Sequence, residues 1–254
     1  MKGWIAQGVR PVVVVEPNPA ANLVSLARAN VVRLLHSIDA VAREPVGACV
    51  VALKPQVLRT EAVCLGPVAQ SGALMVSIAA GTSIASLKRA WGRGAVVARA
   101  MPNTPGAVGK GITALYAPRG VGRDLRNLAA SLMRGLGETF WVTSETDIDT
   151  VTAVSGSGPA YVFLLVEVLA AAARQQGLPA VIADRLARAT ITGSGALLDA
   201  DPRPAAALRT DVTSPHGTTE AALQVLMKKD AFRLLVGEAV AAARRRAEEL
   251  RHEG

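Results

Sequence analysis

The chain has few of the side chains that build disulfides and metal sites. Its two cysteines, Cys49 and Cys64, do not have C-x-x-C spacing, and its three histidines form no ligand cluster along the sequence. Disulfide frameworks and structural zinc sites need more cysteine or histidine at closer spacing. The sequence therefore predicts neither a disulfide nor a bound metal.

Aromatic residues are also scarce, at 3% of 254 residues. Surfaces that bind single-stranded nucleic acid use aromatic side chains to stack on bases, so this scarcity argues against such a surface. The formal net charge of +8 does not reverse that conclusion, because the basic residues are scattered and only Arg244, Arg245 and Arg246 form a run. We interpret the charge as solvated helix faces that also attract small anionic molecules.

The sequence has no long hydrophobic run. Glu167 interrupts the longest candidate, which begins at Tyr161, before it reaches the roughly 20 residues of a membrane-spanning helix. The N-terminus has Lys2 but no apolar segment of signal-peptide length before Gly8. Hydrophobic residues make up 50% of the chain, which is enough for a sizeable core. We expect a cytoplasmic, globular protein without a membrane partner.

The first half of the chain alternates between strand-like and helix-like segments. The strand candidates are VVVVE, NVVRLL, ACVVAL, ALMVSI, AVVARA, GITALY and TFWVT. Such runs are apolar throughout, as is typical of parallel strands covered by helices on both faces. The pattern predicts an α/β domain with a doubly wound parallel sheet. Helix starts are predicted at Asn18 with Pro19, and at Thr82 and Ser83 for a helix that ends near Gly92.

The strand signal stops near residue 143, and long alanine- and leucine-rich segments follow. We predict helices over residues 158–177, 179–200, 217–228 and 230–252. Their apolar residues cover most of the helix circumference, which a small helical domain cannot bury alone. The sequence therefore predicts an all-α second domain that dimerises.

The chain opens on the end of a helix. In a doubly wound sheet, the first strand leads through a G-x-G turn into the first helix, whose N-terminus binds phosphate. Here MKGWIAQG matches the last two turns of that helix, and PVVVVE matches the second strand. The alternative is an unusual fold that begins with a short helix.

Three polar segments are candidates for ligand binding. Lys54 ends a predicted strand, where α/β sheets bind ligands, although an exposed loop lysine fits equally well. Asn103 follows two strand ends with small side chains and offers a donor and an acceptor to an amide, although asparagine is also common in turns. The third segment pairs two helix starts, SGSGPAY and DVTSPHGTTEAAL. The first is explained by helix initiation, whereas the hydroxyls of the second suit a carboxylate ligand, with a capped loop as the alternative.

The segments ALKP, VSIAAGTSIASLK, MPNTPGAVGKGITALY, DIDTVTAVSGSGPAYVFLLVEVLAAAARQQGLP and LRTDVTSPHGTTEAAL together resemble, in order, the pyrroline-5-carboxylate reductase family. The resemblance implies reduction of 1-pyrroline-5-carboxylate to L-proline with NADPH or NADH, the last step of proline biosynthesis. It implies a Rossmann-like domain over residues 1–143 and an all-α dimerisation domain over residues 144–254. It also implies a homodimer, or a higher assembly of dimers, whose active site forms between one subunit's nucleotide domain and its partner's helices.

The resemblance also assigns the site residues. It implies that the cofactor is bordered by Ala52, Leu53, Lys54, Pro55, Ala79, Ala80 and Asn103, with the nicotinamide nearest the last three. It implies that the substrate is held by Glu145, Ser214, Gly217, Thr218 and Thr219. Thr219 is the expected catalytic residue, because its hydroxyl would hydrogen-bond the ring nitrogen while hydride arrives.

Three features depart from the family. The first strand and its G-x-G turn are missing, which we attribute to a misassigned start codon. His216 stands where the family usually has glycine, and Glu16 ends the second strand, where an acid favours NAD and where Arg33 could offset it. The alternative functions are a dimeric relic that lost catalysis with its phosphate loop, and a β-hydroxyacid-type dehydrogenase, whose usual lysine helix is not evident.

Overall fold

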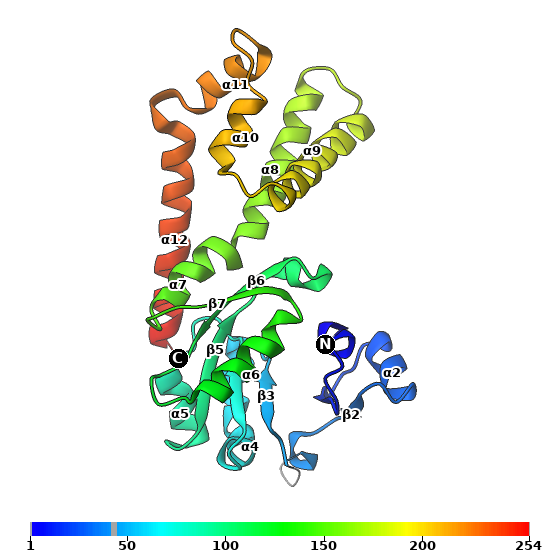
Figure 1. Ribbon diagram of the computed structural model, residues 1–254, viewed down its shortest axis with the longest axis vertical. Helices are drawn as coiled ribbons and strands as arrows, with labels where there is room; N and C mark the ends of the chain where they lie inside the picture. The colour runs from blue at the N-terminus through cyan, green and yellow to red at the C-terminus, as the bar shows by residue number, and fades with distance from the viewer. Residues whose placement is uncertain (1, 42–44, 254) are drawn as a thin grey trace. The chain divides into compact units, whose positions relative to one another are not determined.

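The computed structural model describes residues 2–41 and 45–253 (Figure 1). By compactness the chain divides into one unit of Met1–Gly156 with Ala243–Gly254, and a second unit of Ser157–Ala242. The end of the terminal helix thus packs with the first unit. The domain ranges 1–143 and 144–254 stay a prediction.

Each predicted strand run overlaps one strand of the first unit. The strands are β1 (Val13–Val15), β2 (Arg33–Leu35), β3 (Ala48–Val51), β4 (Leu74–Ser77), β5 (Val96–Met101), β6 (Gly111–Tyr116) and β7 (Gly137–Trp141). The helices are α1 (Lys2–Ala6), α2 (Ala21–Arg28), α3 (Pro55–Glu61), α4 (Gly66–Gln70), α5 (Ile84–Trp91), α6 (Arg123–Arg134) and α7 (Asp147–Val151). Short 3-10 segments η1 (Ile38–Ala40), η2 (Ala62–Leu65) and η3 (Thr104–Val108) and a π-helical turn η4 (Thr152–Gly156) complete the unit.

The larger sheet has the order β3-β4-β5-β6-β7. Its β3–β4, β4–β5 and β6–β7 pairs are parallel, but β5 and β6 are antiparallel, with Arg99 opposite Tyr116. The prediction of a wholly parallel sheet was therefore wrong at this pair. Residues 102–110 between the two strands contain only η3, and a parallel crossover needs about a dozen residues or more.

Helices cover both faces of this sheet (Figure 1), which confirms the doubly wound architecture. Neighbouring residues of β4 point to opposite faces: Leu74 and Val76 pack with α6, whereas Met75 packs with α5 and η2. All three side chains are fully buried. Burial on both faces explains why the strand sequence is apolar throughout instead of alternating.

The strands β1 and β2 form a separate parallel pair. Among the described residues no strand joins β1 to β3, although Val13, Val15 and Leu35 pack against the same core cluster as Val51. In a sheet of order 3-2-1-4-5-6, the strands that match β1 and β3 flank the first strand. The split into two sheets is therefore what a sheet without that strand requires.

The second unit is helical, as predicted. It contains α8 (Gly158–Gln175), α9 (Ala180–Ala200), α10 (Ala205–Asp211), α11 (Thr218–Leu226), the 3-10 segment η5 (Lys228–Asp230) and most of α12 (Ala231–Glu253). The short helix α10 was not predicted. It lies between Pro204 and the hydroxyl-rich loop, and seven residues are too few for a clear helical period.

Two of the predicted helix starts differ in outcome. Ser83 caps α5 as expected, since its hydroxyl accepts a hydrogen bond from the amide of Ser86. The cap at Asn18 was wrong, because α2 begins at Ala21 after Ala20 and has no side-chain cap. The amide of Asn18 instead donates to Glu16 Oε1 at 3.0 Å, so this asparagine belongs to a turn that ends β1.

One helical stretch, Asp147–Gln175, is long and apolar enough by length and composition to cross a membrane. The expectation that Glu167 rules out such a span was therefore too strict. Its exposed side chains include Phe163, Leu164 and Val168, at 61%, 57% and 55% exposure. A helix whose apolar surface is covered by a protein partner has the same length and composition as a membrane span. These two properties therefore do not distinguish the two kinds of helix.

Candidate active site

The predicted cofactor residues lie along one edge of the sheet. Residues 52–55 follow β3, Ala79 and Ala80 follow β4, and Asn103 follows β5. These strands are adjacent and parallel, so their carboxyl ends share an edge, which is where open α/β sheets bind ligands. The structure therefore brings together Ala52, Leu53, Lys54, Pro55, Ala79, Ala80 and Asn103. Lys54 is exposed there, at the N-cap of α3.

The turn after β4 leaves little side-chain bulk at this edge. Ala79 is buried, and its amide donates to Ser77 Oγ at 3.3 Å. Gly81 follows with φ +64°, a left-handed conformation that suits glycine. A Cβ built on Gly81 would lie 2.6 Å from Leu250 Cβ, so the turn is pressed against the end of α12. Small residues here let a flat ring approach the backbone.

Asn103 is only partly available to a ligand. Its Oδ1 accepts a hydrogen bond from the amide of Ile112 at 3.0 Å, which ties the loop to the start of β6. The side-chain NH₂ group is thus the half that remains to donate to a ligand. Asn103 was predicted to offer a ligand both a donor and an acceptor, but with Oδ1 bonded to Ile112 it offers the donor.

Glu145 lies beside the same turn. Its Oε1 accepts from the amide of Ile84, the first residue of α5, at 2.7 Å, and from Arg99 Nη1 at 3.2 Å. The Arg99 side chain is 2% exposed and that of Glu145 is 24% exposed. Among the described residues, neither a hydrogen bond nor an ion pair is formed by Glu145 Oε2. The amides at the start of α5 are therefore capped by protein groups, and one carboxylate oxygen stays available.

A second buried ion pair lies next to the first. Asp149 Oδ2 and Arg251 Nε are 3.0 Å apart, with side-chain exposures of 1% and 20%, although their angles do not suit a hydrogen bond. Burial raises the pKa of Asp149, and the neighbouring Arg251 and Arg99 oppose that rise. Burial lowers the pKa of Arg99, and Glu145 opposes this change.

Sequence reasoning missed Arg99, Asp149 and Arg251. One signal was present, because an arginine inside the apolar run AVVARA implies a buried charge that needs a partner. The partners lie 46 residues away for Glu145 and across the chain for Arg251, so their identity was not readable from spacing.

Four of the five predicted substrate residues, Ser214, Gly217, Thr218 and Thr219, lie at or just before the start of α11 in the second unit, whereas Glu145 lies in the first unit. Gly217 is the N-cap of α11, Thr218 and Thr219 are its first two residues, and no side chain caps it. Thr219 is half-buried, and Ser214 is exposed. A Cβ on Gly217 would lie 2.4 Å from the Ser214 hydroxyl, so a side chain at this position would displace that hydroxyl. Free helical amides and nearby hydroxyls form a site for a carboxylate.

His216 has φ +59°, and its amide donates to Glu220 Oε2 at 2.6 Å. The loop therefore holds histidine in a left-handed conformation that glycine adopts without strain. A surface depression of about 390 Å³ lies beside the loop and is lined by Arg209, Thr210, Thr213, Glu220, Leu223, Gln224 and Met227. The Thr213 hydroxyl donates to Arg209 O and is thus not a ligand donor.

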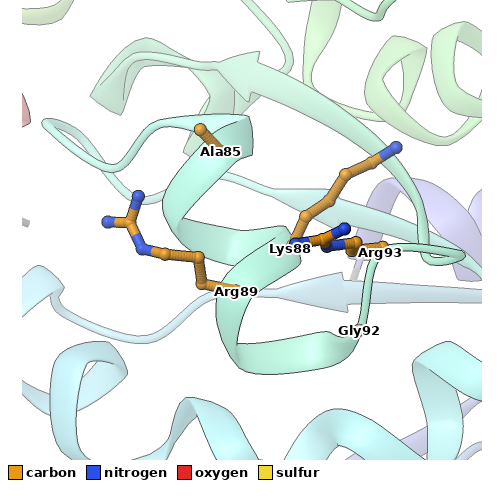
Figure 2. A pocket seen from close by; sticks show the side chains of 5 residues that line it. All are labelled: Ala85, Lys88, Arg89, Gly92 and Arg93. Atoms are coloured by element: carbon orange, nitrogen blue, oxygen red, sulfur yellow. The ribbon is translucent and has the colours of Figure 1, made fainter.

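The larger depression, of about 410 Å³, is elsewhere (Figure 2). It is formed by Ala85, Lys88, Arg89, Gly92 and Arg93 on and after α5. Lys88, Arg89, Gly92 and Arg93 lie on the last turn of α5 or after it, toward the amino ends of the strands, whereas Ala85 is in the first turn. Figure 2 shows Lys88 and Arg89 pointing to opposite sides of the helix, so their charges do not converge on one ligand.

Glu16, which is predicted to lie near the ribose of the cofactor, directly follows β1. Arg33 pairs with Val13, at the start of the strand, and therefore lies away from the carboxyl end. The expectation that Arg33 could offset Glu16 stays a prediction. Cys49, on β3, is a free thiol whose pKa is raised by burial to about 11, so it is a poor nucleophile.

Comparison with known proteins gives one consistent answer. Residues 145–250 match the family described as pyrroline-5-carboxylate reductase dimerisation. Pyrroline-5-carboxylate reductase of Pseudomonas aeruginosa is 40% identical over 201 residues, which cover 79% of this chain and 73% of that protein. The protein of the same name from Synechocystis is 42% identical over 199 residues, covering 78% and 73%.

Solved structures agree with these relatives. A pyrroline-5-carboxylate reductase from Coxiella burnetii superimposes with a TM-score of 0.87 at 35% identity, covering 98% of this chain and 92% of that one. The Plasmodium falciparum pyrroline carboxylate reductase with NADP bound gives 0.81 at 26% identity, with the same coverages. The chain therefore belongs to the pyrroline-5-carboxylate reductase family.

Proposed function

We propose that this protein reduces 1-pyrroline-5-carboxylate to L-proline with NADPH or NADH, the last step of proline biosynthesis. The observation that carries the proposal is the 40% identity to a pyrroline-5-carboxylate reductase over 79% of the chain. No observation on the described residues favours the alternative of a relic that has lost catalysis.

The nicotinamide end of a cofactor fits the carboxyl edge of the sheet. Ala79, Ala80 and the left-handed Gly81 keep the turn after β4 free of bulk, and the Asn103 NH₂ group is a donor for a carboxamide oxygen. Lys54 supplies a cation for phosphate, while Ala52, Leu53 and Pro55 border the same edge. When bound there, the reduced nicotinamide supplies the hydride.

The loop before α11 is proposed to hold the substrate. The amides of Thr218 and Thr219, at the helix N-terminus, and the Ser214 hydroxyl would bind the carboxylate, with Gly217 leaving room for that hydroxyl. The Thr219 hydroxyl would hydrogen-bond the ring nitrogen and keep a proton there, which makes the imine carbon electrophilic. Glu145, beside the start of α5, is proposed to contribute to substrate binding as well.

The proposal includes a homodimer in the cytoplasm. The match to a dimerisation family over residues 145–250 supports self-association, and the exposed apolar side chains of α8 supply a surface for it. The chemistry supports the location, because reduced nicotinamide cofactors are intracellular reductants. An assembly of several dimers is the further possibility, and sedimentation of the purified protein distinguishes it from a single dimer.

The test is turnover by the purified chain. With 1-pyrroline-5-carboxylate and NADPH or NADH, we expect proline to form in step with cofactor oxidation. Omission of the substrate should stop the oxidation. A folded dimer that forms no proline with either cofactor would favour the relic instead.

A further inference from the structure

A guanidinium is buried in the middle of the sheet. Arg99 lies on β5 between Ala98 and Ala100, and all three residues are at most 3% exposed. An uncompensated charge at such a place is strongly destabilising, so a buried arginine is retained only with partners. Its hydrogen-bond partner is Glu145, at 3.2 Å.

Four charged side chains balance one another at this place. Arg99 and Glu145 form one pair, Asp149 and Arg251 form the other, and Arg99 also interacts electrostatically with Asp149 and Arg251. Glu248 adds a further negative charge near Asp149 and is itself paired with Arg244 at 3.0 Å. The group joins β5, the turn before α7, α7 itself and the end of α12.

Two contacts hold the carboxylate of Glu145 in place. Oε1 is occupied by two donors, Arg99 Nη1 and the amide of Ile84. Because both donors contact the same oxygen, they hold the carboxylate between Arg99 and the start of α5. Ile84 begins α5 shortly after Ala79 and Ala80, so the carboxylate of Glu145 lies beside the edge where the nicotinamide is proposed to bind.

We propose that Arg99 is a positioning residue of the reductase and acts through Glu145. Its guanidinium holds the carboxylate of Glu145 and the first amide of α5 in one arrangement. The inference rests on the proposed function, and it adds a residue that makes no contact with substrate or cofactor. A structural role alone would stabilise the fold without changing the kinetics of the folded protein.

The experiment compares Arg99→Lys, Arg99→Met, Glu145→Gln and the double variant Arg99→Met/Glu145→Gln. We expect Arg99→Met to raise the KM for pyrroline-5-carboxylate, or to lower kcat, by about tenfold, through loss of a charge-assisted hydrogen bond. Arg99→Lys keeps the charge with a different donor geometry, so its kcat and KM should lie between those of Arg99→Met and the unaltered protein. Arg246→Gln, which breaks an exposed pair with Glu249 on the same helix, is the matched control.

The double variant is the decisive measurement. If Arg99 acts through Glu145, the double variant is no slower than Glu145→Gln alone. The inference would be overturned if the activity losses of Arg99→Met and Glu145→Gln multiply in the double variant. It would also be overturned if the Arg99 variants have lower melting temperatures but the same kcat and KM as Arg246→Gln. If Arg99→Met does not fold, Arg99→Lys and its double with Glu145→Gln decide the question by the same criteria. An inactive but folded unaltered protein would overturn the proposed function as well, which separates the two failures.

Discussion

At the scale of single residues, Thr219 carries the largest predicted share of the chemistry. It is half-buried in the first turn of α11, whose N-terminus has no side-chain cap. Thr219→Ala should lower kcat by about 10²-fold, the low end for loss of a group that assists proton transfer. Thr219→Ser keeps the hydroxyl and should retain most activity. Equal turnover by Thr219→Ala and the unaltered protein would show that the hydroxyl has no such role.

The buried Asp149 predicts a pH-dependent stability. Its pKa in the folded protein is raised above the ordinary 3.8, so its contribution to stability is full below that value and is lost as pH rises through the folded pKa. Removal of Arg251 takes away a charge that opposes the rise in the pKa of Asp149. The pH range over which stability is lost then extends upward. Arg251→Gln should therefore lose more stability at about pH 8 than at about pH 5, with a difference of up to about 3 kcal/mol.

Thermal melting across that pH range measures the effect of Arg251→Gln. The double variant Asp149→Asn/Arg251→Gln has no carboxylate to titrate and should lose the extra pH dependence. A constant difference from the unaltered protein at every pH would show that the pair is not coupled to protonation of Asp149.

At the scale of elements, the loop before α11 is held by one strained residue and one closely packed glycine. His216→Gly should relieve a left-handed conformation that costs about 1 kcal/mol, partly offset by the entropy of glycine in the unfolded chain. Gly217→Ala should instead push the Ser214 hydroxyl from its place and raise the substrate KM. Melting temperature and steady-state kinetics of both variants test this contrast. It fails if Gly217→Ala binds substrate normally.

Elements with a strong local signal were predictable from the sequence. Every β-branched run coincides with a strand, and the long helices α8, α9, α11 and α12 match their predicted ranges closely. Ser83 and the left-handed Gly8 and Gly92 likewise act as local stops and caps. These features depend on neighbouring residues, so one sequence is enough to find them.

Elements that depend on distant partners were not predictable. The reversed direction of β6 follows from the short connection after β5, and the start of α2 follows from how Glu16 ends β1. The site loops were recognised by their motifs, but the pairing of Arg99 with Glu145, and of Asp149 with Arg251, depends on the tertiary fold. Asn103 shows the same limit, since its contact with Ile112 joins two strands.

At the scale of the whole molecule, the helical unit predicts self-association. Phe163 on α8 is 61% exposed, and several neighbours on the same helix are similarly exposed. Phe163→Glu would place a charge in a surface that a partner is expected to bury, so the dimer should dissociate at least about tenfold more readily. Light scattering at micromolar concentration measures this, with the exposed Gln175→Glu at the end of α8 as the control. A monomeric unaltered protein would contradict the prediction.

The reductase proposal is tested most directly by following the hydride itself. The protein is incubated with 1-pyrroline-5-carboxylate and NADPH, or NADH, that carries deuterium at C4 of the nicotinamide, and the proline is analysed by mass spectrometry and NMR. We predict one deuterium at C5 of L-proline, with one cofactor oxidised for each proline formed. Proline without deuterium from either C4 position, or no proline from a folded protein, would contradict the account.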